Sequence, residues 1–319
     1  MTVASSADVG AQPSAGPKAP VLAEVVRSGF AESRHRGSLV TLDVDGRVDW
    51  ALGEVAAPFF PRSSNKPMQA TAVLRSGLEL SGPRLALAAG SHAGAEIHQQ
   101  LAGRVLAEHG LAEAALRCPE STPGFGAGPG PRGRLAMNCS GKHASWLAAS
   151  VVNDWPVASY LEPEHPLQRL IRETVVELSG EPVTALGVDG CGAPLQALSL
   201  TGLARAFRAA VLADPGAPER RVADAMRAHP EYVAGEGMLD TLLMRQVPGL
   251  LAKGGAEGVQ AVALADGRAF AFKIEDGSSR ARDAITARVL AALGVKASVV
   301  PVTSVLGGGV PVGEIRAAF

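Results

Sequence analysis

A serine and a lysine stand three residues apart, at Ser63 and Lys66, in the stretch PRSSNKPMQA. At the start of a helix two such residues share one face, so a neutral lysine amine could accept the proton of the serine hydroxyl. This spacing indicates an activated nucleophile. A structural alternative stays open, in which a serine caps the helix and the lysine is solvated; Pro67 suits a first helical turn in both cases.

Two glycine-containing turns hold cysteines. In LAMNCSGKHASW, Cys139 precedes a predicted helix that has Lys142 and His143 in its first turn. A thiol at a helix N-terminus is acidified and reactive, although a small residue packed under the turn would fit the same pattern. In LGVDGCGAP, a predicted buried strand leads into Asp189 and Cys191, among glycines that let the backbone approach a ligand. Asp189 at this strand end could bind an amine.

Two further stretches, GSHAGAEIH and LAKGGAEGV, bring polar groups beside glycines. Ser91 and His92 precede a predicted helix, and Lys253 stands at a predicted strand end. The lysines are informative because six of the 30 basic residues are Lys and the others are Arg. A buried Lys can lose its proton and Arg cannot, so such a chain could keep Lys where a tunable amine is needed. The alternative is that a few surface lysines simply remain.

The elements that must position these residues follow from hydrophobic periodicity. Asp-Gly turns at 45–46 and 266–267 join apolar runs and predict two hairpins, and residues 21–29 have strand character. The Gly- and Pro-rich residues 121–134 predict a loop. The fold class is therefore α+β, an antiparallel sheet flanked by helices, with a helical insert in the middle. Helical periodicity covers 64–75, 82–89, 94–109, 142–153, 166–179, 217–228, 237–245 and 278–294.

Composition excludes several classes of protein. The 319-residue chain is 47% hydrophobic, which is enough to bury a large core. A net charge of −1 gives no sign of a nucleic-acid surface, and no stretch approaches the roughly 20 apolar residues of a membrane span. Residues 1–20 predict a disordered leader before a single catalytic domain at 21–319. Three cysteines, Cys118 among them, are too few for a disulfide framework and favour a reducing, cytoplasmic setting.

In their order and spacing, these stretches resemble the L-asparaginase II family, the serine–lysine, zinc-binding class of L-asparaginases. The resemblance runs from ESRHRGS through RSSNKPMQA, GSHAG, NCSGKHA, GVDGCGAP, VAGEGMLDTLLM and KGGAEGV to the 278–294 helix, and covers most of residues 21–295. It implies a fold similar to serine β-lactamases and penicillin-binding proteins. Ala95 stands where the family usually has Glu, and Met137 where it has Asn.

The resemblance also implies catalytic roles. Ser63 matches the family nucleophile and Lys66 its base, while Ser91 and Lys253 match a second serine–lysine pair. Arg62 matches a position that contacts substrate. The implied reaction is hydrolysis of the L-asparagine side-chain amide to L-aspartate and ammonia, through an acyl-enzyme.

A second set of roles concerns substrate and metal. Asp189 matches a substrate-contacting position, and Cys139, Lys142 and Cys191 match ligands of one zinc ion. His143 stands beside them in the same motif, and we expect it to contact substrate. The resemblance further implies a homodimer.

Two alternatives stay open. One is another serine–lysine amide hydrolase, such as a glutaminase or a β-lactam or peptide hydrolase. The other is a non-catalytic, zinc-bound module that binds amino acids, although such a binder need not keep both lysines.

Overall fold

The structure is a computed structural model that describes residues 19–124, 127–296, 298 and 300–319. The disordered leader that the sequence predicts at 1–20 lies outside the described residues except for its last two positions. None of the described helices is long and apolar enough to cross a membrane.

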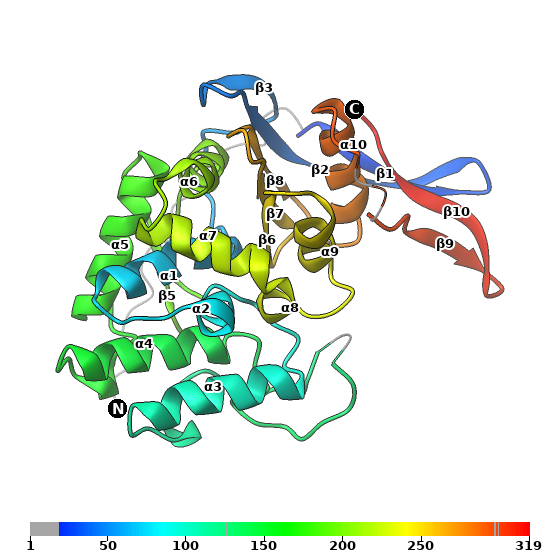
Figure 1. The fold of residues 1–319 in the computed structure, drawn as a ribbon. Helices are drawn as coiled ribbons and strands as arrows, with labels where there is room; N and C mark the ends of the chain where they lie inside the picture. The colour runs from blue at the N-terminus through cyan, green and yellow to red at the C-terminus, as the bar shows by residue number, and fades with distance from the viewer. Residues whose placement is uncertain (1–18, 125–126, 297, 299) are drawn as a thin grey trace, which may run out of the picture.

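One antiparallel sheet organises the chain (Figure 1). Its strands lie in the order β6-β7-β8-β2-β1-β10-β9, and β3 pairs with β2. Every residue of β6 and β7 is buried, so this end of the sheet is covered on both faces. The strand bounds are β1 Val21–Arg27, β2 Phe30–Leu42, β3 Val48–Leu52, β6 Leu251–Gly255, β7 Val259–Ala263, β8 Ala269–Ile274, β9 Ser304–Gly307 and β10 Val310–Ala317.

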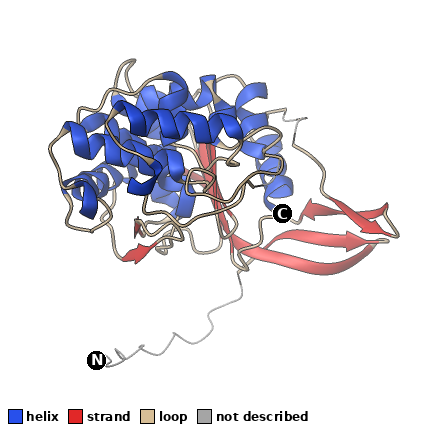
Figure 2. Cartoon of the chain, turned by 90° about the horizontal axis from the view of Figure 1, so that it is seen from below, coloured by secondary structure: helices blue, strands red, loops and turns tan. Residues whose placement is uncertain are grey.

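Strand β2 belongs to two halves of the sheet. Its residues 30–36 pair with β1, and residues 37–42 pair with β8. Gly37 lies where the partner changes, and a Cβ added there would be 2.1 Å from the carbonyl oxygen of Lys273. Glycine therefore allows the two strands to approach at this point. Beyond Gly37, on the side where β2 pairs with β1, the strands β1, β2, β9 and β10 form a ribbon that projects from the helices (Figures 1 and 2).

The helices between β3 and β6 form a body on one side of the sheet, and α10 packs on the other side (Figure 1). Helix α6 makes the main contact of the body with β2, β7 and β8. The predicted class, an antiparallel sheet flanked by helices, is confirmed. The bounds are η1 Arg62–Asn65, α1 Lys66–Arg75, α2 Gly82–Ala88, α3 Glu96–Glu108, η2 Glu113–Ala115, α4 Ser140–Val152, η3 Val157–Ser159, α5 Pro166–Ser179, α6 Leu200–Leu212, α7 Pro218–Ala228, α8 Pro230–Val233, α9 Leu239–Gln246 and α10 Arg282–Ala292.

The predicted helices are all present, with small differences at their ends. Helix α6 was not predicted, because it follows directly on an apolar run and its first residue, Leu200, is followed by Thr201 and Gly202, two weak helix formers. The β9–β10 hairpin was not predicted either, although Gly308 and Gly309 at its turn, both with positive φ, are a hairpin signal.

The prediction of a buried strand before Asp189 is wrong. Strand β4 spans Leu186–Val188 and pairs with β5, Pro194–Gln196, in a small sheet of their own. Both end residues of β4 are exposed, Val188 at 79%. Every residue of its partner β5 is buried, so within this pair the burial falls on β5, and the apolar residues of β4 do not indicate burial.

The turn that carries Ser63 packs directly on β6. A Cβ added at Gly255, the last residue of β6, would be 2.5 Å from the carbonyl oxygen of Pro61 and 3.2 Å from the backbone nitrogen of Ser64. Glycine at 255 therefore allows the strand and the turn to touch backbone to backbone.

Replacing Gly255 with Ala should destabilise the protein, because the added methyl group forces β6 away from the Ser63 turn. Overpacking of this kind costs about 1–3 kcal/mol of the free energy of unfolding. Denaturant titration measures it.

The matched control is Gly103→Ala in α3, where the added Cβ meets nothing nearer than 3.8 Å. Better helix propensity should there raise stability by about 0.5–1 kcal/mol. Equal effects of the two substitutions would contradict the tight contact at Gly255.

Candidate active site

Two serine hydroxyls face each other at the centre of the site. Ser91 Oγ donates to Ser63 Oγ over 3.2 Å, and both residues are partly exposed. Ser63 lies in η1, directly after Arg62, which has a positive φ of 53°. Left-handed backbone at a residue with a long side chain is strained by about 1–2 kcal/mol, and such strain gathers at functional sites. Ser91 is held through its N–H, which donates to Val233 O over 2.7 Å.

Lys66, the first residue of α1, is 1% exposed. Its Nζ donates to the carbonyl oxygen of Gly90 over 2.6 Å and to that of Asn138 over 3.5 Å. The amine therefore ties α1 to the turn that carries Ser91 and to the turn before α4. Among the described residues, no hydrogen bond joins Lys66 Nζ to Ser63 Oγ, so the role of Lys66 as base stays a prediction.

Lys253 is the middle residue of β6, not at the strand end as expected, and is 2% exposed. Its Nζ donates to Gly254 O over 2.7 Å and lies 3.9 Å from a carboxylate oxygen of Asp240. Burial lowers the pKa of Lys253 to about 7; the charge of Lys66 adds to this effect and that of Asp240 opposes it. A large fraction of this amine is therefore neutral at neutral pH.

Arg62 and Asp189 form an ion pair beside Ser63. The distance from Arg62 Nε to Asp189 Oδ1 is 2.7 Å, and the Gly190 N–H donates to the same oxygen over 2.8 Å. Burial raises the pKa of Asp189, but Lys142 and Arg62 outweigh it and hold the pKa below its ordinary value. Asp189 is therefore an anion at neutral pH.

Two thiols and an amine gather behind Asp189. Lys142 Nζ donates to Cys191 Sγ over 3.2 Å. A hydrogen bond with Cys191 holds the pKa of Cys139 well below its ordinary value, and the same bond raises the pKa of Cys191. Burial lowers the pKa of Lys142, but the two thiols raise it above its ordinary value. The pKa of each group in this cluster therefore depends on the charge of the others.

His143 completes this cluster and is fully buried. Tyr160 OH accepts from the Arg117 N–H and lies 2.7 Å from His143 Nδ1, so the tyrosine donates to that nitrogen. The Nε2 atom then carries the proton, and it has no hydrogen-bond partner among the described residues. Burial lowers the pKa of His143 to about 4, so it is neutral. Its contact with substrate stays a prediction.

The donor set fits the predicted zinc ion. Two thiols, one already acidic, and an amine meet in a buried cluster, and His143 lies close enough to Cys191 for that thiol to affect its pKa. Thiolates are preferred zinc ligands. Among the described residues, no three His, Cys, Asp or Glu side chains lie together in a metal-binding arrangement, so zinc depends on Lys142 as the third donor. A lysine must lose its proton to bind metal.

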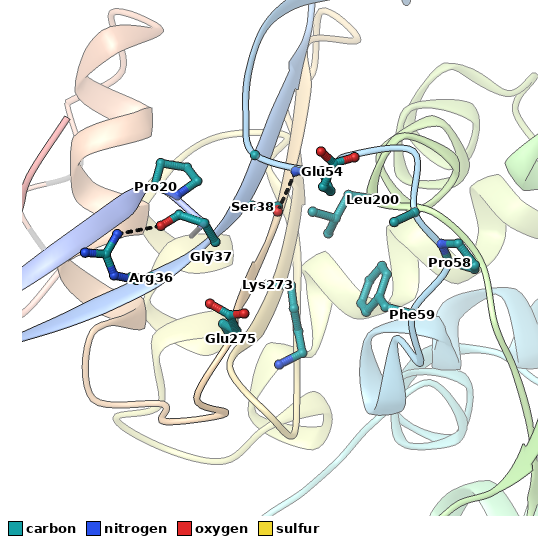
Figure 3. A pocket seen from close by; sticks show the side chains of 13 residues that line it. Pro20, Arg36, Gly37, Ser38, Glu54, Pro58, Phe59, Leu200, Lys273 and Glu275 are labelled. Carbon is teal, nitrogen blue, oxygen red and sulfur yellow. Dashed lines mark hydrogen bonds between the residues drawn. The ribbon is translucent and has the colours of Figure 1, made fainter. Parts of the chain in front are cut away.

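The predicted site residues are thus brought into one region by these contacts. A hollow of about 370 Å³ opens beside Ser91 and reaches Met137 and Met238. A larger hollow of about 680 Å³ lies elsewhere, against β2 and β8, with Lys273 and Phe59 in its wall (Figure 3). None of the predicted site residues lines it, so we assign substrate binding by chemistry and not by size.

Asp240 and Tyr160 were not predicted from the sequence. Asp240 is the one acidic residue in GMLDTLLM, and an isolated charge within an apolar helical stretch could have indicated a buried carboxylate. Tyr160 gives no such signal, because it lies in a loop and reaches His143 only through the tertiary fold.

The chain matches the L-asparaginase II family over residues 23–317, nearly its whole length. It belongs to the L-asparaginase II family. A search of curated protein sequences found no match. Membership of the L-asparaginase II family indicates an enzyme of the amidohydrolase type.

Solved structures similar to this L-asparaginase II family chain are distant from it in sequence. Mglu in its native form is 13% identical, with a TM-score of 0.46, covering 86% of this chain and 70% of that one. Mglu in its L-glutamate binding form is 14% identical, with a TM-score of 0.47, covering 86% and 64%. A β-lactamase from Mycobacterium bovis is 15% identical, with a TM-score of 0.45, covering 80% and 94%.

Proposed function

We propose that this protein hydrolyses the side-chain amide of L-asparagine to L-aspartate and ammonia, with Ser63 as nucleophile. The observation that carries the proposal is the Ser63–Ser91 hydroxyl pair together with two buried lysines: Lys66 binds the carbonyl of Gly90 next to Ser91, and Lys253, with a pKa of about 7, lies in the strand that packs on the Ser63 turn. Such a group can accept and return protons near neutral pH.

In the first half of the reaction, Ser63 Oγ attacks the carboxamide carbon and the C–N bond breaks. For this the hydroxyl pair, which lies 3.2 Å apart, turns so that Ser63 donates to Ser91 and Ser91 donates toward the neutral amine of Lys253. The Lys253 ammonium then gives its proton to the leaving nitrogen, which departs as ammonia. Lys66 holds the Gly90 carbonyl and so keeps Ser91 in place during this step. In the second half, water attacks the ester carbonyl, aspartate is released and Ser63 regains its proton.

The amino-acid end of the substrate binds at the Arg62–Asp189 pair. Asp189 Oδ1 is taken by Arg62 and Gly190, whereas Oδ2 has a long contact of 3.9 Å from the Cys191 thiol, so Oδ2 is the oxygen that we expect to accept from the substrate ammonium. Arg62 has further N–H groups for the substrate carboxylate. The charges of Arg62 and Asp189 therefore favour an α-amino acid amide over a substrate that lacks a free ammonium group.

Zinc is the cofactor that we propose, held by Cys139, Lys142 and Cys191, since this cluster offers two thiols and an amine in one buried place. When bound, zinc supplies a fixed positive charge that orders the turn before α4 and the turn after β4. Homodimer assembly and a cytoplasmic location remain predictions.

Ser63→Ala should abolish ammonia release from L-asparagine, because the nucleophile is lost. Ser64→Ala is the matched control: its buried hydroxyl donates to Pro61 O over 2.7 Å, so its loss should cost about 1 kcal/mol of stability but leave turnover. Ammonia release and intact-mass detection of an acyl-enzyme are the measurements. Turnover near the wild-type rate in Ser63→Ala would contradict the assignment of Ser63 as the nucleophile.

The same assays separate the rival functions. L-glutamine tests for a glutaminase, and a chromogenic cephalosporin tests for a β-lactamase. Binding of L-asparagine to the wild type without any ammonia release would favour the non-catalytic module.

Activity should rise with pH, with a midpoint near the pKa of about 7 of Lys253, because the protonated amine cannot accept a proton. Lys253→Met should remove this rise near pH 7, which is the rising limb of the pH profile, and the activity that remains should rise only at higher pH. The measurement is kcat/KM for L-asparagine from pH 5 to 10.

Lys273→Met is the matched control, since Lys273 lies in the other hollow and should leave the limb in place. A limb unchanged in Lys253→Met would contradict the role of this lysine.

Purified protein should contain zinc, and Cys191→Ser should lose most of it. Cys118→Ser should not, because burial raises the pKa of Cys118 to about 11 and keeps it a neutral thiol. Zinc affinity should fall at acidic pH, where protons compete for the thiolates. Elemental analysis and chelator titration measure this, and zinc absent even after its addition would reject the site.

A further inference from the structure

A carboxylate inside the core stands next to Lys253. Asp240, in the first turn of α9, is 4% exposed. Its Oδ2 accepts from the Gly254 N–H over 2.8 Å and lies 3.9 Å from Lys253 Nζ, while its Oδ1 accepts from Gln260 Nε2 over 2.9 Å. The carboxylate thus contacts the amine of Lys253 and the backbone of the next residue at the same time.

These contacts hold the Lys253 amine from two directions. Its Nζ donates to the Gly254 carbonyl over 2.7 Å, and the N–H on the other side of that residue donates to Asp240. Gln260, on the neighbouring strand β7, fixes the second carboxylate oxygen. Asp240 therefore determines where the amine points as well as the charge that it meets.

We propose that Asp240 is a positioning residue, which aims the amine of Lys253 and sets the pH at which that amine becomes able to accept a proton. The proposal rests on the proposed function, in which Lys253 takes up the proton of the nucleophile. Asp240 touches neither Ser63 nor Ser91 through any hydrogen bond among the described residues.

The charges that surround Lys253 fix the sign of the effect. Lys66 from α1 and Arg282 from α10 disfavour its ammonium form, whereas Asp240 and, from the turn before α4, the Cys139 thiolate favour it. Burial acts in the same direction as the two cations. Removing the charge of Asp240 therefore leaves the cations less opposed, and the amine should lose its proton at a lower pH.

Asp240→Asn tests the charge at nearly constant shape. The amide oxygen can still accept from the Gly254 N–H, and the new NH₂ group can donate to Gln260, whose Oε1 lacks a partner among the described residues. Loss of one opposite charge at this distance shifts a pKa by about one unit or more. We expect the rising limb of kcat/KM to move down by about one pH unit, with reduced kcat because the amine is less well aimed.

Two further variants separate charge from packing. Asp240→Glu keeps the charge but displaces it, so the limb should stay near its wild-type pH while kcat falls. Gln260→Met removes the hydrogen bond to Asp240 and leaves its charge, so it should destabilise the protein without moving the limb downward. An effect that is merely structural would give all three variants the same pH profile.

A second readout does not depend on turnover. The chain has six lysines, so ¹³Cε NMR of labelled lysine can follow each amine, and Lys253→Met assigns the relevant signal. Its titration midpoint should move to lower pH in Asp240→Asn and stay in Gln260→Met. A midpoint that is unchanged or higher in folded Asp240→Asn would overturn the proposal, as would an equal downward shift in Gln260→Met. Wild type without ammonia release would reject the proposed function instead, and the NMR result would still report on Asp240.

Discussion

The burial of three lysine amines is the constraint on which the site depends. Lys66, Lys142 and Lys253 are among the largest fully buried side chains of the described protein. An amine removed from water must find acceptors or give up its proton. The acceptors here are backbone carbonyls for Lys66, thiols for Lys142, and a carbonyl with a carboxylate for Lys253. The partners of Lys66 and Lys142 lie 24 and 49 residues away in sequence, so binding these two amines brings distant turns together. Lys253 instead uses Gly254, its neighbour in β6, and Asp240 in α9.

The neighbours of each amine, and not burial alone, decide its chemistry. Lys142 and Lys253 are equally buried, yet the pKa of Lys142 is raised and that of Lys253 is lowered to about 7. The thiols of Cys139 and Cys191, with the carboxylate of Asp189, favour the charged form of the first amine. At the second, two cations add to the effect of burial and outweigh the nearby carboxylate. Without a bound metal ion, Lys142 is therefore suited to stay charged, and Lys253 to exchange protons.

Local patterns were enough to predict much of the fold, because helices with one apolar face and Asp-Gly hairpins report on their own neighbourhood. The stretch before α1 and the turns at Cys139 and Cys191 could be identified as chemical sites for the same reason. Partners that meet only in the folded chain could not be identified. The contact of Lys66 with the Gly90 carbonyl, the approach of Asp240 to Lys253 and the small separate sheet of β4 all depend on tertiary packing. Their sequence signals are single residues without periodicity.

The order of the strands has a consequence for how the chain is made. Strands β1 and β2 are synthesised before the strands that flank them. Strand β2 cannot pair with β8, nor β1 with β10, until those later strands have been made; Ala23 of β1, for example, pairs with Ala317. Such distant pairings slow folding, because the entropy of closing a long loop is lost before the strand contacts that offset it can form. During synthesis the first hairpin has free edges on both sides, and free strand edges invite pairing between chains. Nascent chains of this protein should therefore need protection from one another until their last strands emerge.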